Sequence, residues 1–330
     1  MTTMPATTTA VAAALDLPAV DRWHRPLVVV AAAMGVLALV TGVLALVDQR
    51  EILGQIAWLK PLKFAISLAL YAITMAWMLG QLRRWRRAAD IAGTVTAVAI
   101  LAEIVVITGA AAVGTTSHFN VTTPLNGALW GIMGASIATL WIAGLLVAIA
   151  LAVNPMPDRA RTLAVRAGIG IGLVGMAIAF LMTGPTQAQL ADFQGIAGAH
   201  AVGVADGGAG LPFLGWSTEG GDLRVPHFVG MHALQLLPLG LLGLELAGRR
   251  IRVLGDPRVR LELVAVAALA MVALLALLTL QALAGQPVVA PAGPFLAAGV
   301  ALVVATLGAT TVVLVRGRAR SAPTLATVHA

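Results

Sequence analysis

Long apolar stretches follow one another along most of this sequence, separated by short polar or glycine-rich segments. About eight of them are long enough for a helix to cross the roughly 30 Å hydrocarbon core of a bilayer. They lie at about 27–47, 60–80, 91–113, 127–152, 164–183, 225–247, 260–284 and 294–315. Because backbone polar groups find no partner in lipid, such segments form α-helices. The pattern predicts an all-α, polytopic integral membrane helix bundle with about eight transmembrane helices.

The same pattern predicts one domain with two tails. Residues 1–25 are rich in Thr and Ala and are expected to form a mobile cytoplasmic N-terminal tail. Residues 26–316 form a single transmembrane bundle, and residues 317–330 a cytoplasmic C-terminal tail. The one long connection, residues 184–224, is expected on the external side.

The amino-acid composition is also typical of an integral membrane protein. Of its 330 residues, 59% are hydrophobic and only 11% are charged, whereas soluble domains carry about 25% charged residues. The net charge of +7 would suggest nucleic acid in a soluble protein, but here arginines that anchor cytoplasmic loops explain it better. We therefore expect the lipid bilayer as partner and no nucleic acid. The sequence has no cysteine, which excludes disulfides, iron–sulfur clusters and thiolate-bound haem.

The basic residues are distributed unequally between alternate loops. Four of the 21 Lys and Arg residues, Arg50, Lys60, Lys63 and Arg224, fall on one side of the predicted bundle, which leaves seventeen on the other. The positive-inside rule places the arginine-rich side and both termini in the cytoplasm. The Arg, Ala, Gly and Val bias is typical of a high-GC bacterial genome, so the expected location is a bacterial inner membrane.

The long loop, residues 184–224, has features of a functional lid. Ten glycines lie between Gly184 and Gly221, among Phe193, Phe213 and Trp216. Long ordered loops are frequently binding loops, and these aromatics favour a loop that packs back onto the bundle. The alternative is a flexible external connector.

Four of the six histidines collect on the external side. His118, His200, His227 and His232 are the candidate metal ligands, and the neighbouring Asp206, Asp222, Arg224 and Gln235 are the candidate ligand-binding residues. His232 and Gln235 share a helical face, whereas His227 and His232 lie about 140° apart on an ideal helix. The histidines therefore converge on one ion only if the first helical turn is distorted. Solvated loop histidines are the alternative interpretation.

The chief anomaly inside the membrane is Glu103, near the middle of the third apolar segment. A carboxylate there costs roughly 2.5–3.5 kcal/mol on insertion scales and marks a functional site by default. Lys60 and Lys63 are the nearest cations, although snorkelling interface lysines are common. Glu103 and Lys63 are the candidate catalytic residues. Glu103 lies about 15 Å below the external end of its helix, so we expect it not to reach His118. Glu245 is expected to pair with Arg249, one turn away.

Three stretches resemble a family of bacterial multi-pass membrane proteins. They are SHFN, KPLKFAISLALY and GWSTEGGDLRVPHFVGMHALQLLPL, and the similarity extends from the first helix to about residue 285. The resemblance implies a shared fold of about eight helices. The family is uncharacterised, so the resemblance implies no activity, cofactor or catalytic residue.

Three functions remain open on the sequence. One is a membrane enzyme or redox protein whose histidines bind haem or a divalent metal ion. Another is a transporter or receptor that binds a small polar ligand or a proton through Glu103 and the outer histidines. The third is a structural membrane subunit without a site of its own. The sequence leaves the oligomeric state open.

Overall fold

The computed structural model describes residues 20–154, 156 and 158–321. Within this part of the chain, eight helices are long and apolar enough to cross a membrane. They are α2 (Arg25–Val47), α3 (Leu59–Gly80), α4 (Arg86–Val113), α5 (Pro124–Val153), α6 (Arg159–Ile178), α8 (Arg224–Gly248), α9 (Pro257–Leu283) and α10 (Pro294–Ser321). The expected all-α architecture is confirmed, and the eight helices indicate a multi-pass membrane protein.

The remaining elements are short and lie in the connections. Three 3-10 turns, η1 (Val20–Arg22), η2 (Ala179–Met182) and η3 (Arg252–Gly255), accompany the one-turn helix α7 (Gln187–Ala191). Strand β1 (Glu51–Ile52) pairs antiparallel with β2 (Gln55–Ile56), and β3 (Ala201–Val202) pairs with β4 (Gly221–Asp222). The β3–β4 pair joins the middle of the long loop to its end. Neither pair was expected from the hydrophobic pattern.

Several helices begin before the apolar run that predicted them, because polar caps define their first turn. The side chains of Thr123 and Asp158 accept hydrogen bonds from the backbone N–H of Asn126 and Arg161. Asp256 caps α9 in the same way. Capping residues satisfy N–H groups that have no partner within the helix. The helices therefore start up to about five residues earlier than hydropathy placed them.

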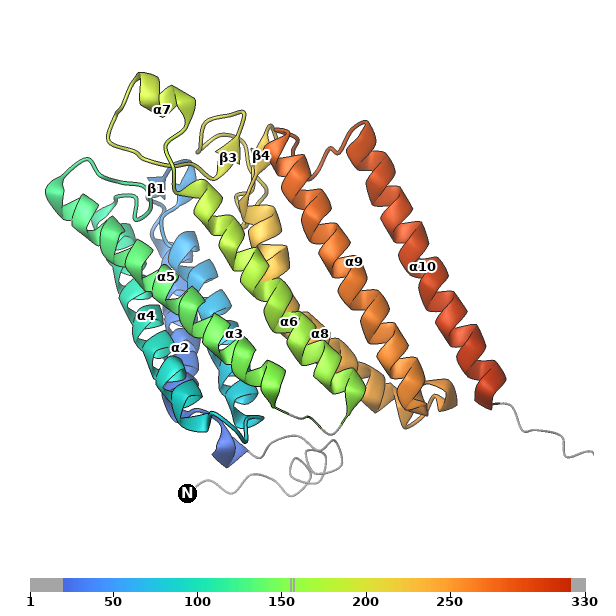
Figure 1. The fold of residues 1–330 in the computed structure, drawn as a ribbon. Coiled ribbons are helices and arrows are strands. Elements are labelled where there is room, and N and C mark those ends of the chain that lie inside the picture. The colour runs from blue at the N-terminus through green and yellow to red at the C-terminus, as the bar shows by residue number, and fades with distance from the viewer. Residues whose placement is uncertain (1–19, 155, 157, 322–330) are drawn as a thin grey trace, which may run out of the picture.

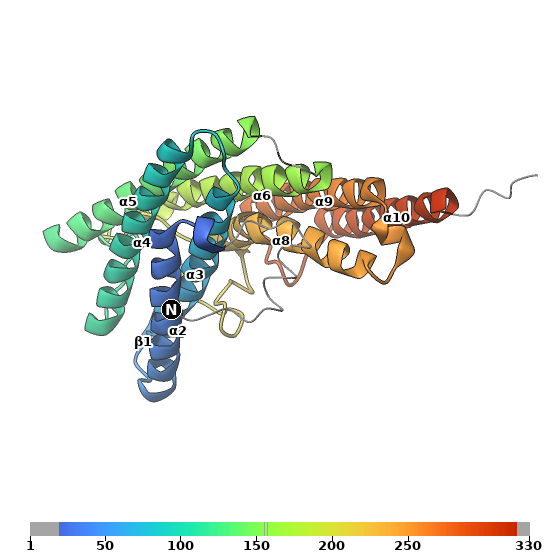
Figure 2. The ribbon, with the colours of Figure 1, turned by 90° about the horizontal axis from the view of Figure 1, so that it is seen from below.

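The helices form two groups that meet at α6. Figures 1 and 2 show α2, α3, α4 and α5 together on one side, and α8, α9 and α10 in a row on the other. One core cluster contains Leu27, Met75 and Ile100 and takes in Ile169 of α6. A second cluster contains Leu275 and also draws on α6. We call α2–α5 the N-terminal group and α6 with α8–α10 the C-terminal group.

Two glycines bring α6 and α8 into backbone contact. A Cβ atom on Gly175 would lie 2.4 Å from the carbonyl carbon of Gly230 and from the amide nitrogen of Met231. Small residues at crossing points are how membrane helices approach closely. This contact fixes the height of α8 against α6.

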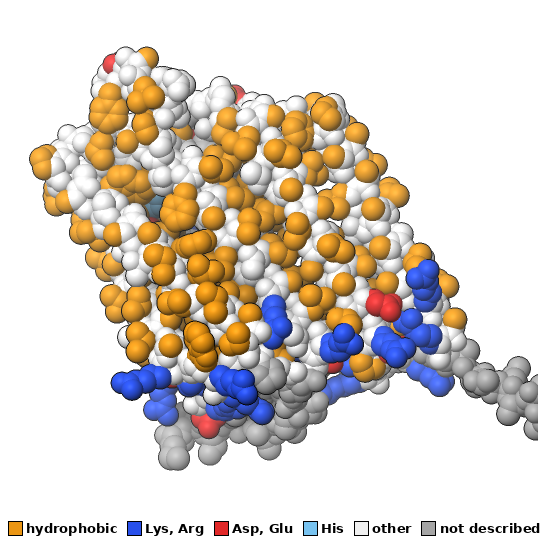
Figure 3. Space-filling model, viewed as in Figure 1, with side chains coloured by type: hydrophobic (Ala, Val, Ile, Leu, Met, Phe, Trp, Pro, Cys, Tyr) orange, Lys and Arg blue, Asp and Glu red, His pale blue; other side chains and the backbone are white. Residues whose placement is uncertain are grey.

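The two ends of the bundle differ in charge as expected. The helix order places the loops that contain seventeen basic residues at one end, which we call the arginine-rich end, and Figure 3 shows Lys and Arg side chains gathered there on the face in view. Buried Asn154 stabilises this end, because its side chain bonds the backbone N–H groups of Arg83 and Arg84 and the Arg84 carbonyl. We call the opposite end the loop end, because residues 184–223 lie there.

One expected ion pair is wrong. Glu245 does not pair with Arg249 but with Arg161 of α6, whose Nη2 lies 3.2 Å from the Glu245 Oε1. Arg249 is the exposed residue that ends α8, whereas Arg161 faces α8 from the neighbouring helix. Instead of the expected ion pair within one helix, the structure therefore has a nearly buried ion pair between α6 and α8.

Most of both expected tails, residues 1–19 and 322–330, lies outside the described residues. His24 was expected within the N-terminal tail, but it is part of the fold and is 6% exposed. Its Nδ1 accepts a hydrogen bond from the Leu27 N–H, and its Nε2 lies 3.0 Å from the Asp90 carbonyl oxygen. His24 therefore caps α2 and links it to α4.

Candidate functional site

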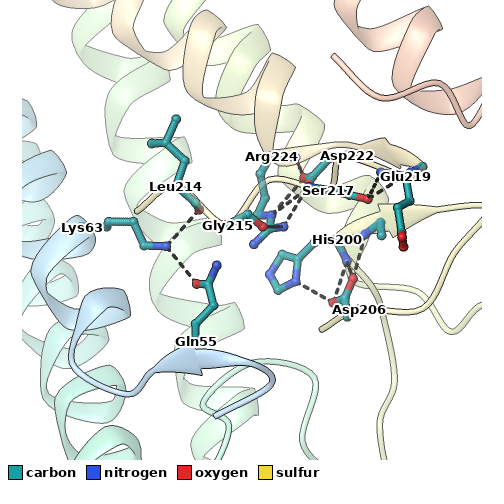
Figure 4. Close-up of polar contacts among 12 residues, drawn as sticks. Gln55, Lys63, His200, Asp206, Leu214, Gly215, Ser217, Glu219, Asp222 and Arg224 are labelled. Atoms are coloured by element: carbon teal, nitrogen blue, oxygen red, sulfur yellow. Dashed lines mark hydrogen bonds and ion pairs between the residues drawn. The ribbon is translucent and has the colours of Figure 1, made fainter. Parts of the chain in front are cut away.

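Polar side chains from both helical groups meet at the loop end, beneath the long loop. They come from the start of α3, the outer half of α4, the α4–α5 connection, the long loop and the start of α8. We call this cluster the polar site; it consists of Lys60, Lys63, Glu103, His118, His200, Asp206 and Arg224. Figure 4 shows Lys63, His200, Asp206 and Arg224 with their partners.

Glu103 and His118 are neighbours, so the expectation that Glu103 would not reach His118 was wrong. The His118 Nε2 lies 3.9 Å from the Glu103 Oε1. Helical rise does not set this distance, because the chain turns back after α4. Gly114 ends the helix at φ +77°, and Phe119 also adopts a positive φ of 62°. The connection between α4 and α5 thereby carries His118 down to the level of Glu103.

The Glu103 carboxylate is buried and incompletely bonded. The residue is 2% exposed, and its Oε2 has no hydrogen-bond partner among the described residues. A buried polar atom without a partner costs about 1–3 kcal/mol, more when it is charged. An intramembrane acid with such an atom is a candidate for binding a proton or a ligand.

The ring of His118 is enclosed by aromatic side chains. Ring centroids of Phe64 and Trp130 each lie 5.6 Å away, and that of His200 lies 6.4 Å away. Burial lowers the pKa of His118 well below 6.5, and the charges of Lys60, His200 and His227 lower it further. His118 is therefore neutral at physiological pH. The Ser117 Oγ, 3.0 Å from its Nδ1, helps to orient the ring.

His200 and Asp206 form an oriented imidazole–carboxylate pair. The His200 Nδ1 lies 2.7 Å from the Asp206 Oδ2, as Figure 4 shows. Burial opposes ionisation of Asp206, but hydrogen bonds from the ring and backbone of His200 and from the Ala201 N–H hold its pKa below the ordinary value. Burial also lowers the pKa of His200. We assign the proton of the neutral ring to Nδ1, which leaves Nε2 as an acceptor.

Lys63 and Arg224 hold one turn of the long loop from two sides. The Lys63 Nζ donates to the Leu214 carbonyl at 3.0 Å and to the Gln55 Oε1 at 3.3 Å. The Arg224 Nη2 donates to the Gly215 carbonyl at 2.6 Å, and its guanidinium forks onto the Asp222 carboxylate. Figure 4 shows both cations converging on this turn. Lys63, Arg224 and Asp222 thus anchor the loop.

Lys60 differs from its neighbour Lys63. Its ammonium makes no hydrogen bond or ion pair with any described residue, yet its charge interacts with Glu103 and Arg224. The sequence prediction named Lys63, and not Lys60, as a candidate catalytic residue. Position along the chain does not distinguish two lysines one turn apart, so the structure was needed to separate their roles. The structure makes Lys60 the available cation of the site.

The four histidines do not share one coordination sphere. The His227 Nδ1 lies 2.9 Å from the Gly175 carbonyl oxygen, and the His232 Nδ1 lies 3.3 Å from the Gln235 Oε1. His118 and His200 are brought together, as described above. Over the described ranges, no group of three or more His, Cys, Asp or Glu side chains is placed to hold a metal ion.

The long loop makes many contacts with the bundle, but not through all the expected aromatics. Phe193 and Phe213 are 55% and 46% exposed, whereas Trp216 packs against Phe228 with ring centroids 6.1 Å apart. Backbone contacts supply the rest: the Ala199 N–H donates to the Met182 carbonyl of η2, which continues α6. Gly221 is required where the loop meets α9, since a Cβ there would lie 1.9 Å from the Ala282 carbonyl oxygen. These contacts are typical of a loop packed onto the bundle.

Sequence analysis missed the residues that shape the surroundings of His118. Phe64 and Trp130 lie within apolar helices, where an aromatic side chain is indistinguishable from one that faces lipid. Asn120 is 5% exposed, and its Nδ2 donates to the Thr115 Oγ1, which stabilises the returning connection. The SHFN stretch, read as a family motif, was the available signal.

Comparisons of this chain with protein-family models, with curated proteins and with solved structures found no match. The resemblance drawn from the sequence stretches stays a prediction.

Proposed function

We propose that this protein is a transporter or receptor of the bacterial inner membrane that binds a small polar ligand in the polar site and exchanges a proton there. The observation that carries the proposal is the buried Glu103 carboxylate, with one oxygen 3.9 Å from the His118 Nε2 and the other without a described partner. Ionisable groups inside a membrane bundle characteristically mark ion, proton or substrate sites.

Orientation is part of this proposal. The positive-inside rule assigns the arginine-rich end to the cytoplasm and the loop end to the external side. Both described ends of the chain, at Val20 and Ser321, lie toward the arginine-rich end. The polar site then faces outward, beneath the long loop, and between the two helical groups. Many membrane-protein ligand sites lie at such junctions.

Glu103 and His118 have complementary roles in the proposal. Neutral His118 offers a hydrogen-bond acceptor or donor at Nε2, and the Glu103 carboxyl group supplies the exchangeable proton. His200, oriented by Asp206, presents a second neutral imidazole to the same space. A polar ligand entering from the loop end would thus meet two imidazoles before the buried carboxyl group.

Infrared difference spectroscopy of protein in lipid nanodiscs tests the proton exchange. We expect a carboxyl carbonyl band that changes with pH and is absent in Glu103→Gln. Glu51→Gln is the matched control, because Glu51 is exposed at the same end of the bundle. His118→Gln should shift the band without removing it. Identical titrations of the wild type and Glu103→Gln would contradict the proposal.

A second candidate, a membrane enzyme, draws on the His200–Asp206 pair. An imidazole oriented by a carboxylate is the arrangement of general bases and of metal-bound or haem-bound histidines. The lack of a three-ligand group among the described side chains weighs against a divalent metal ion. Metal analysis and a visible absorption spectrum of the purified protein separate the candidates. A haem Soret band, or stoichiometric metal that His200→Ala abolishes, would favour the enzyme over the transporter or receptor.

A further inference from the structure

The distribution of positive charge at the loop end is unexpected for an external face. Only four basic residues lie there, and three of them, Lys60, Lys63 and Arg224, belong to the polar site. The fourth, Arg50, is 50% exposed and pairs with Asp48. Because external Lys and Arg are disfavoured, their concentration around one buried carboxylate needs a specific cause.

Internal partners account for two of the three cations. Arg224 is matched by the Asp222 carboxylate, whose side chain is fully buried, and Lys63 by the carbonyl of Leu214 and the amide of Gln55. Lys60 has no such partner in the described part of the chain. Its only nearby acids are Glu103 and Asp206, and the Asp206 carboxylate is already occupied by His200 and two backbone N–H groups.

The backbone adds to the positive potential around Lys60. Helix α3 begins at Leu59, and its N-cap residue Trp58 makes no side-chain capping bond. Pro61 has no N–H, so the first-turn donors without a side-chain cap are those of Leu59 and Lys60, and the helix dipole places partial positive charge at the same point. A helix N-terminus alone is not a site, but here it coincides with a lysine that lacks a hydrogen-bond partner.

Glu103 provides independent evidence for a ligand. It is 2% exposed, its Oε2 lacks a described partner, and it lies within electrostatic range of Lys60 without forming an ion pair. If the two groups existed only to neutralise each other, a direct contact would be expected. The Lys60 ammonium and the Glu103 Oε2 are thus both without a hydrogen-bond partner among the described residues.

We infer that the ligand of the polar site carries an anionic oxygen group, a carboxylate or a phosphate, and that Lys60 binds this group. This inference rests on the proposed function. The ammonium of Lys60 and the first turn of α3 contact the anionic oxygens, and the protonated carboxyl of Glu103 donates a hydrogen bond to one of them.

Thermal unfolding in nanodiscs of phosphatidylcholine tests the inference. Sodium phosphate and sodium acetate are each compared with sodium chloride at equal ionic strength. We expect at least one of them to raise the wild-type Tm in a concentration-dependent way, as ligands of the native state do. Lys60→Gln should weaken the apparent affinity at least about tenfold. Arg50→Gln, which removes the exposed basic residue of the same end, should respond like the wild type.

A second arm distinguishes a free anion from a lipid headgroup. The same proteins are unfolded in nanodiscs that contain phosphatidylglycerol, without added anion. A rise in Tm that Lys60→Gln abolishes and Arg50→Gln retains would assign the anionic group to a lipid. The inference is overturned if neither free anions nor anionic lipid stabilise the wild type, or if Lys60→Gln responds as the wild type does.

Lys60→Arg keeps the test decisive if Lys60→Gln does not fold. It preserves the charge and should retain at least part of the anion response, whereas Lys60→Met should lose it. Failure here is distinct from failure of the proposed function. If Glu103 titrates in the infrared experiment but no anion effect depends on Lys60, only the identity of the ligand is wrong. If Glu103 does not titrate, the proton exchange itself is refuted.

Discussion

Replacement of Gly175 by Ala should destabilise the protein more than any neighbouring glycine substitution in α6. The added Cβ would lie 2.4 Å from the carbonyl carbon of Gly230 and from the nitrogen of Met231. Both are backbone atoms of α8, so no side-chain rotation can relieve the contact. The perturbation also affects the polar site, because the Gly175 carbonyl accepts a hydrogen bond from His227.

The magnitude follows from the geometry. Carbon atoms in contact lie about 3.5–4 Å apart, so α6 and α8 would have to separate by about 1 Å or more. Overpacking of this kind costs about 1–3 kcal/mol, and the loss of the bond to His227 adds about 1 kcal/mol. We therefore expect the free energy of unfolding to fall by about 2–4 kcal/mol.

Gly170→Ala is the matched control. Gly170 lies in the same helix, is exposed and has no atom within 4 Å of an added Cβ, so the change should be within about 1 kcal/mol of zero and of stabilising sign. Equilibrium unfolding in mixed detergent micelles, followed by circular dichroism, measures both variants. A Gly175→Ala protein as stable as Gly170→Ala would refute the backbone contact between α6 and α8.

Three further predictions concern the ion pair, the buried imidazole and the orientation. Glu245→Ala should lower the free energy of unfolding by about 1.5–3 kcal/mol, because it removes the charged hydrogen bond between Arg161 and α8. Arg249→Ala should have little effect, and equal losses in the same unfolding assay would contradict the pairing. His118 has a pKa below its ordinary 6.5, so its contribution to stability is complete above about pH 6.5 and is lost as pH falls below that value, by at most about 1.4 kcal/mol per pH unit. Acid titration of unfolding in His118→Gln should show a shallower slope, and an unchanged slope would mean that His118 does not resist protonation. The chain has no cysteine, so single introduced cysteines can be labelled without background. Cysteines at the exposed positions Ala209 and Val289 should react with an impermeant thiol reagent in intact cells, whereas those at Ala88 and Ala319 should not. The reverse pattern would invert the topology.

The fold was largely predictable because the bilayer imposes a strong rule. Any chain segment in lipid must satisfy its backbone internally, so hydropathy alone located all eight long helices to within a few residues at most ends. The boundaries were less accurate where polar caps such as Asp158 and Asp256 extend a helix beyond its apolar run. The division of basic residues between the two ends was also predictable, because alternation along the chain fixes it.

The polar site was predictable in its members but not in its geometry. Glu103, His118, His200, Asp206 and Arg224 were all singled out, since charged and imidazole groups are conspicuous in an apolar sequence. The distances between these side chains could not be predicted, because helical rise does not describe the path of a connection that folds back onto the bundle. The returning segment from Gly114 to Asn120 brought His118 to Glu103 against the expectation.

Hydropathy, length and order along the chain were enough to predict the number of helices, their alternation across the bundle and the end at which the histidines collect. Which side chains pair depends instead on how the helices pack. The tertiary structure assigned Glu245 to Arg161, Asp206 to His200 and Lys63 to the long loop, and it left Lys60 without a hydrogen-bond partner in the described chain. Such pairings depend on how helices rotate and approach at contacts such as Gly175 with Gly230. The energies that select one packing over another come from many weak contacts among residues far apart in sequence, and no local pattern records them.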